Sequence, residues 1–184
     1  MANTEKTPFD TARNIISVQH YRSSAGELIL GSIEGRLCLC DWLRSRHRAS
    51  TDAKIQKSLS AVYREQPSET ILLAARQLDE YFARQRTRFD IPLLFTGTDF
   101  QKTVWNELLN IPYGTTISYG CLARRIGKPN HVRATANANG ANPISIFAPC
   151  HRVIGSTGSL TGYGGGLTAK RILLELESGA IPLL

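Results

Sequence analysis

The residues of this chain that could do chemistry gather in "FAPCHRVIGS", residues 147–156. Cys150 stands between Pro149 and His151, and Arg152 follows. A thiol reacts as the thiolate, and a neighbouring imidazole or cationic surroundings favour that form. Two interpretations are open at this point: a nucleophile activated by His151, or a buried structural thiol beside a surface histidine. Neighbouring side chains on an extended segment point apart, so contact between Cys150 and His151 would need a turn or a bridging water.

A catalytic imidazole also needs a third group that orients it. The acidic residues after position 97 are Asp99, Glu107, Glu175 and Glu177. The segment "LTAKRILLELE" (167–177) predicts a helix that packs through Leu167, Ile172, Leu173 and Leu176. At ~100° per residue, Glu175 and Glu177 point about 160° apart on such a helix, so only one of them can face the cysteine.

Charge is distributed unevenly along the chain, whose 184 residues carry a net charge of +7. Residues 108–174 contain no Asp or Glu. The basic residues of this stretch are Arg124, Arg125, Lys128, Arg133, Arg152, Lys170 and Arg171. A long stretch without acids predicts a surface that faces phosphates, and hence a nucleic-acid partner.

Composition excludes several other classes of protein. No apolar run approaches the ~20 residues that span a bilayer, and the polar N-terminus predicts no signal peptide. The four cysteines have no disulfide spacing, so we expect a reduced, cytoplasmic protein. Cys38 and Cys40 share a strand face but lack a second ligand pair, which favours buried thiols and no metal. The Gly-rich "GSTGSLTGYGGGLT" lacks the Lys-Ser/Thr of a phosphate-binding loop, so we expect no nucleotide cofactor and interpret it as a flexible pocket wall.

The first half reads as strands followed by a helix. "NIISVQHY" and "GELILGSIEGRLCLCDW" predict strands, and "LRSRHR" (43–48) reads as a solvated basic loop. Residues 68–83 predict an amphipathic helix capped by Ser68. Pro92 marks an extended connection, and a boundary near 88–97 divides the chain into domains 1–90 and 98–184.

The second half predicts mainly helices. A helix over 98–112 is expected to be buried through Phe100, Val104, Trp105, Leu108 and Leu109. Ser118 should cap a helix to about residue 126, and a turn at 127–129 leads to a second helix over 130–139, the helix-turn-helix plan. The second helix is rich in small residues, with Arg133 as its one cation. "ISIFA" (144–148) predicts a short buried strand or an extended segment that leads into Cys150.

A thiol beside a DNA-binding scaffold has few uses, and here a resemblance becomes specific. "ISYGCLARRIGKPNHVRATANANG", "NPISIFAPCHRVIG" and "LTGYGGGLTAKRILLELE" resemble the O6-alkylguanine-DNA alkyltransferase family over about residues 95–177. The resemblance implies an α+β protein with two domains. The N-terminal domain would have a small antiparallel, ribonuclease H-like sheet with helices, and the C-terminal domain would be mostly helical and contain the helix-turn-helix. The run 135–137 (Thr-Ala-Asn) departs from the Val-Gly-Ala-like run of the family, which bears on DNA affinity rather than on chemistry.

The resemblance also implies a catalytic set and a reaction. Cys150 would take the alkyl group from O6 of guanine in duplex DNA, irreversibly and once per molecule, with O4-alkylthymine as a further substrate left open. His151 would act as base through a bound water, Glu177 would orient His151, and Asn142 would tie the network together. No cofactor or metal takes part.

The remaining implied residues bind DNA. The partner would be double-stranded DNA bound through its minor groove by a monomer, with cooperative binding left open, and the damaged nucleotide would be flipped out. Arg133 would fill the gap and Tyr119 would contact the guanine and its phosphate. Further DNA contacts would come from Ala134, Ala138 and Arg152. The guanine pocket would be lined by Tyr119, Val153, Ser159, Tyr163, Gly164 and Lys170.

Three rival functions share parts of this pattern. A damage-binding alkyltransferase-like module lacks the nucleophile, so the presence of Cys150 argues against it. A helix-turn-helix transcription factor usually carries a dimerisation element, and none is evident. A Cys-His hydrolase would need an oxyanion hole and would leave the basic surface unexplained.

Overall fold

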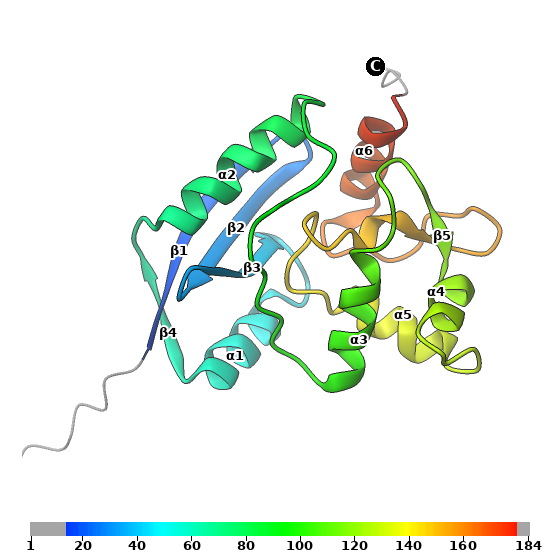
Figure 1. Cartoon of the computed structure of the whole chain (residues 1–184), viewed down its shortest axis with the longest axis horizontal. Coiled ribbons are helices and arrows are strands. Elements are labelled where there is room, and N and C mark those ends of the chain that lie inside the picture. The colour runs from blue at the N-terminus through cyan, green and yellow to red at the C-terminus, as the bar shows by residue number, and fades with distance from the viewer. Residues whose placement is uncertain (1–13, 180–184) are drawn as a thin grey trace, which may run out of the picture.

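A computed structural model describes residues 14–179 of the chain, which form an α+β fold (Figure 1). The strands are β1 (Asn14–Ser23), β2 (Gly26–Ile33), β3 (Arg36–Trp42), β4 (Ala61–Glu65), β5 (Ile117–Ser118) and β6 (Val153–Ile154). The helices are α1 (Arg48–Leu59), α2 (Glu69–Phe82), α3 (Asp99–Leu108), α4 (Tyr119–Arg125), α5 (Val132–Gly140) and α6 (Gly166–Ser178), with a short 3-10 helix, η1, at Cys150–Arg152. The outer limits of the two predicted domains, residues 1 and 184, lie outside the described residues.

The N-terminal sheet has the strand order β3-β2-β1-β4. The pairs β1–β2 and β2–β3 are antiparallel, as expected of a small antiparallel sheet. β4 pairs with β1 in parallel, starting with Asn14 opposite Ala61, so the expectation of a wholly antiparallel sheet is wrong. A helix rather than a tight turn connects β3 to β4, and this longer connection allows β4 to run parallel to β1.

That connecting helix, α1, and β4 were not predicted from the sequence. α1 buries only Ile55, so its residues show no apolar stripe at helical spacing. The basic loop before it was expected and ends where α1 begins, at Arg48.

Helix α2 covers one face of the sheet (Figure 1). The Ser68 hydroxyl accepts a hydrogen bond from the Ile71 amide at 3.1 Å, which confirms the predicted cap. The buried face of the helix includes Ile71, Leu78 and Tyr81. Tyr81 lies near the C-terminal end of α2, from which it reaches toward the second half of the chain.

Side chains cap two helices of the second half, and the cap at Ser118 was predicted. Thr98 and Gln101 form a capping box on α3, and the Ser118 hydroxyl accepts from the Cys121 amide at the start of α4. Leu109 and Leu167 were expected to be buried but are 46% and 49% exposed. Leu109 lies just past the end of α3 and Leu167 at the start of α6, where side chains point out of the core.

The two halves share one interior. The cluster of buried side chains around Leu28 and Leu37 also contains Ile144, Phe147 and Leu173. The expected strand at 144–148 forms only isolated bridges, one of them between Ile144 and Cys40 of β3. β3 therefore supports the segment that leads into Cys150. Within residues 14–179, no helix is both long and apolar enough to cross a membrane.

Candidate active site

Cys150 lies at the start of η1, so the backbone turns where an extended segment was assumed. Its side chain is buried, with 4% of the residue exposed. The Asn142 Nδ2 donates to the Ala148 carbonyl at 2.8 Å, and Asn142 Oδ1 accepts from the Ile144 amide at 3.0 Å. Asn142 therefore fixes the turn in front of Cys150.

His151 and Glu177 meet as the resemblance implied. His151 Nε2 lies 2.7 Å from Glu177 Oε1, and both side chains are fully buried. Glu175 instead lies 3.9 Å from Arg171 and is partly exposed. Only one of the two glutamates faces the site, and it is Glu177.

Glu177 is the centre of a larger network. Tyr81 donates its hydroxyl to Oε1 at 2.7 Å, and the Gly114 amide donates to Oε2 at 3.1 Å. Arg152 donates Nε to Oε2 at 2.8 Å and Nη2 to Oε1 at 2.9 Å. Burial alone would raise the pKa of Glu177, but hydrogen bonds and charges from His151 and Arg152 outweigh it and hold the pKa well below its usual range. Glu177 is therefore ionised.

The DNA contact expected of Arg152 is wrong. Besides the two bonds to Glu177, its Nη1 donates to the Ile111 carbonyl at 2.5 Å, and the residue is only 6% exposed. With all three nitrogens bonded inside the protein, Arg152 positions Glu177 rather than reaching a phosphate.

The protonation states follow from this arrangement. Burial lowers the pKa of His151, although Glu177 acts in the opposite direction, so the resting imidazole is neutral. An ionised Glu177 requires the proton on Nε2, which leaves Nδ1 as the free base. Nδ1 is buried and has no hydrogen-bond partner among the described residues.

The state of the thiol differs from the expectation. Burial raises the pKa of Cys150, and hydrogen bonding from Asn142 and the charge of Lys170 offset only part of the rise. This direction opposes the thiolate form that a neighbouring imidazole and cationic surroundings were expected to favour. The thiol must therefore be deprotonated before it can act as a nucleophile.

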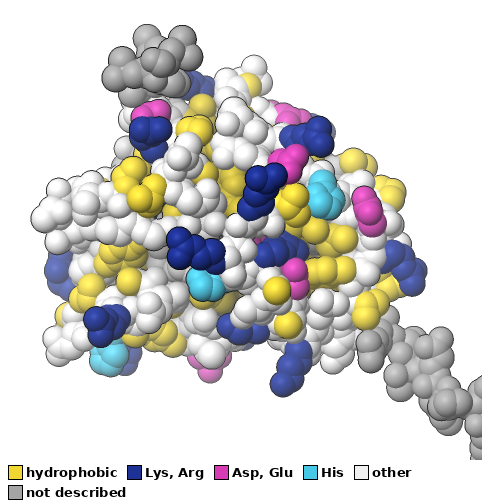
Figure 2. Space-filling view, turned by 180° about the vertical axis from the view of Figure 1, so that it is seen from behind, with side chains coloured by type: hydrophobic (Ala, Val, Ile, Leu, Met, Phe, Trp, Pro, Cys, Tyr) yellow, Lys and Arg dark blue, Asp and Glu magenta, His cyan; other side chains and the backbone are white. Residues whose placement is uncertain are grey.

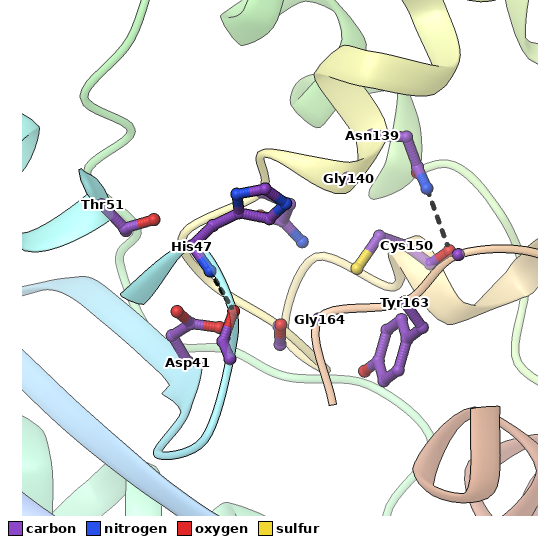
Figure 3. A pocket seen from close by; sticks show the side chains of 12 residues that line it. Asp41, His47, Thr51, Asn139, Gly140, Cys150, Tyr163 and Gly164 are labelled. Carbon is purple, nitrogen blue, oxygen red and sulfur yellow. Dashed lines mark hydrogen bonds between the residues drawn. The ribbon is translucent and has the colours of Figure 1, made fainter. Parts of the chain in front are cut away.

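The sulfur of Cys150 points into a small cavity (Figure 3). Across from it lie Asp41, His47 and Thr51 of the N-terminal half, and Tyr163 and Gly164 form another wall. The cavity volume is about 10 Å³, room for roughly one water molecule. A guanine base does not fit there unless the wall moves.

Some of the predicted pocket residues take other positions. Tyr163 and Gly164 line the cavity, and Tyr119 lines the larger groove next to it. Lys170 is fully buried and donates to the carbonyls of Val153 at 2.7 Å and Thr161 at 2.9 Å, so it connects the Gly-rich loop to β6. Ser159 is exposed and accepts a hydrogen bond from the Gly155 amide through its carbonyl.

The loop also packs on the N-terminal half. A Cβ added to Gly165 would lie 2.5 Å from the Trp42 indole, closer than real Cβ atoms approach. Only glycine therefore lets the loop lie on the end of β3.

Helices α4 and α5 form the expected hairpin, joined by residues 126–131. Arg133 and Ala134 are exposed on α5, whereas Ala138 is 4% exposed and its carbonyl accepts from Trp105 Nε1 at 2.8 Å. The DNA contact expected of Ala138 is therefore wrong, because that face of α5 packs on α3.

The acid-free stretch is less basic at its surface than its sequence suggests. Of its seven Lys and Arg residues, Arg152 and Lys170 are buried. The face of the molecule opposite that of Figure 1 carries basic side chains interspersed with acidic ones (Figure 2). Of the other five basic residues in the stretch, Arg124, Arg125 and Arg133 are exposed on α4 and α5, and Arg125 lies 3.6 Å from Glu107.

Sequence reasoning missed several residues of the site. Tyr81, Gly114 and Asp41 come from segments far from Cys150 in the sequence, and no short-range pattern marks them. Burial raises the pKa of Asp41 to about 6. Within the described part of the chain, no group of three or more His, Cys, Asp or Glu side chains could hold a metal ion.

Comparisons with known proteins agree with this geometry. Residues 99–179 match the family model for the DNA-binding domain of 6-O-methylguanine DNA methyltransferase. The methylated-DNA–protein-cysteine methyltransferase of Mycobacterium tuberculosis is 58% identical over 109 residues, which cover 59% of this chain and 66% of that relative. The protein of that name from Methanosarcina barkeri is 44% identical over 155 residues, 84% of this chain and 92% of the relative. The crystal structure of M. tuberculosis OGT in complex with DNA has a TM-score of 0.77 at 42% identity and covers 91% of this chain and 96% of that chain.

The fold and the site define an α+β protein with a buried free cysteine, followed directly in the chain by a histidine that pairs with a buried carboxylate. The M. tuberculosis sequence alignment spans just under two thirds of that relative, whereas the M. barkeri alignment spans nearly the whole relative. The chain belongs to the methylated-DNA–protein-cysteine methyltransferase family.

Proposed function

We propose that this protein repairs alkylated DNA by transferring the alkyl group from O6 of guanine to its own Cys150, once per molecule. The observation that carries the proposal is a buried Cys150 followed directly in the chain by a buried His151, whose Nε2 lies 2.7 Å from Glu177 Oε1. The relatives named above bear the name of that activity. O4-alkylthymine is a second substrate that the same chemistry would accept.

The chemical step is an in-line displacement. A bond forms between Cys150 Sγ and the alkyl carbon while the bond from that carbon to O6 breaks. The thiol proton passes through a bound water to His151 Nδ1, and Glu177 stabilises the imidazolium that forms. The released guanine takes up a proton in turn, and the thioether has no path back to the thiol.

DNA binding is assigned to the α4–α5 hairpin, which we propose acts as a helix-turn-helix laid in the minor groove. Exposed Arg133 and Ala134 support this assignment, since small side chains allow a close approach and a long one can replace a flipped base. Tyr119, whose hydroxyl accepts from Thr161 at 3.4 Å, is placed to contact the flipped nucleotide.

Four further assignments accompany the proposal. The N-terminal sheet is ribonuclease H-like, and the chain divides into domains 1–90 and 98–184. The protein binds DNA as a monomer and works in the cytoplasm, where its four free cysteines stay reduced.

Titration of the protein against a duplex that contains O6-methylguanine tests the function. Repair should stop at one lesion per protein molecule, and Cys150→Ser should repair none while still binding the duplex. Cys121→Ser, which changes a partly buried thiol of α4, is the matched control and should repair a full equivalent. Repeated turnover, or repair by Cys150→Ser, would overturn the proposal.

A further inference from the structure

A groove next to the cavity joins the N-terminal half to helix α5. Its volume is about 1690 Å³, above the roughly 300–1,000 Å³ of typical small-molecule pockets. One wall is the turn before α1 and the start of α1, including Arg44, Arg46 and Lys54. The other wall includes Asn137 and Gly140 of α5. A groove of this size suits a segment of a macromolecule.

The groove is positively charged. Arg44, Arg46 and Lys54 are exposed, and none of the three forms an ion pair within residues 14–179. Among the described residues, Glu27 is the one acidic residue that lines it, and Glu27 already pairs with Arg22 at 3.1 Å. Three unpaired cations along one wall attract a polyanion.

The start of α1 adds to this attraction. Ser50 and Thr51 of its first turn line the groove, that turn contains no acidic residue, and His47 provides no side-chain cap. The amide groups at a helix N-terminus favour anions. The wall therefore combines exposed cations with backbone donors.

The groove is continuous with the proposed DNA interface. Asn137 follows Arg133 by one helical turn on α5, and Tyr119 also lines the groove. The shared wall of Tyr163 and Gly164 connects the groove to the Cys150 cavity. A DNA strand that continues past α5 from a flipped nucleotide would enter this groove.

We infer that residues 44–54 bind phosphates of the DNA strand next to the flipped nucleotide, so the N-terminal half forms part of the DNA interface. This inference rests on the proposed function, because it takes duplex DNA as the partner. Arg44 and Arg46 hold the strand by charge, without reading its sequence.

Binding measured as a function of salt concentration tests the inference. The probe is a duplex with one O6-methylguanine, and every protein carries Cys150→Ser so that no reaction occurs during the measurement. Arg44→Gln/Arg46→Gln should weaken binding and reduce the slope of log K against log salt by roughly 2, about 0.9 per lost phosphate contact. Arg44→Lys/Arg46→Lys should restore most of the slope, because each position keeps its charge.

The matched control is Arg64→Gln, which removes an exposed cation of β4 outside the groove and should leave the slope unchanged. Thermal melting of each variant verifies its fold. An unchanged slope in the double variant, or an equal loss in Arg64→Gln, would overturn the inference. If the protein with Cys150 intact failed to transfer methyl from the duplex, the proposed function would fall, whereas the slopes would still decide whether the groove binds DNA.

Discussion

Replacing Glu177 by glutamine changes only the charge at the centre of the buried network. The carboxylate accepts five hydrogen bonds, from Tyr81, His151, Gly114 and twice from Arg152. Glutamine has nearly the same shape, but its amide NH2 group would face the hydrogen-bond donors that the carboxylate accepts from. Arg152 would also become a buried charge without a counter-ion. Breaking one partner of a buried ion pair costs about 3–5 kcal/mol, out of a total stability of about 5–15 kcal/mol.

Urea denaturation at neutral pH measures this loss. The midpoint should fall with the slope m unchanged. Glu175→Gln is the control, because Glu175 is partly exposed and 3.9 Å from Arg171, and its loss should cost less than about 1 kcal/mol. The pH dependence has a defined direction: the folded-state pKa of Glu177 is lowered, so its contribution is complete above the unfolded value near ~4.3 and is lost as the pH falls toward the folded value.

The same substitution should impair chemistry. Without the carboxylate, the imidazolium of His151 is less stable and accepts the Cys150 proton poorly. Alkyl transfer should therefore begin at a higher pH and run up to about 10²-fold slower at neutral pH. Should Glu177→Gln alone fail to fold, Glu177→Gln/Arg152→Met removes both charges and should regain stability without regaining rate. Equal stability and equal pH profiles for the position 175 and 177 variants would refute the network described here.

Three further substitutions test other parts of the site. Asp41→Asn should stabilise the protein by up to about 3 kcal/mol at pH 7.5. The pKa of Asp41 is raised to about 6 in the folded protein, so the unsubstituted protein loses stability as the pH rises from about 4 to 6. Denaturation midpoints that shift equally at pH 4.5 and 7.5 on substitution would contradict this. Arg133→Ala should slow repair of a duplex more than reaction with a free O6-alkylguanine base, and equal losses in the two single-turnover rates would mean that Arg133 fills no gap. Gly165→Ala should destabilise the protein by about 1–3 kcal/mol in urea denaturation, because its Cβ would press on Trp42, and a neutral result would show that the loop can move away at no cost.

Local signals predicted much of the secondary structure. The caps Ser68 and Ser118 were predicted because a hydroxyl followed by an amphipathic run satisfies the first free amides, and this can be read from a few residues. α1 was not predicted, because it buries only Ile55 and its sequence therefore lacks the apolar periodicity of a packed helix. β4, which follows it, was not predicted either. The parallel pairing of β4 with β1 depends on that undetected crossover.

The residues of the site likewise divide into those that the sequence predicted and those that it did not. Cys150, His151 and Glu177 were predicted from one motif and a resemblance, and the structure brings His151 and Glu177 to 2.7 Å. Arg152 was misread because a basic residue in an acid-free stretch suggests a phosphate, whereas its guanidinium is bonded to Glu177. The burial of Cys150, which raises its pKa, likewise cannot be judged from neighbours in the sequence.

The thiol of Cys150 as the acceptor of the alkyl group is the central claim, and mass spectrometry of the intact protein and its peptides tests it most directly. After incubation with a duplex that contains O6-methylguanine, the protein should gain the mass of one methyl group in place of one proton, located on the peptide with Cys150. The peptides with Cys38, Cys40 and Cys121 should stay unmodified. A methyl group on any of those three cysteines, or an unmodified protein beside a repaired duplex, would contradict the account.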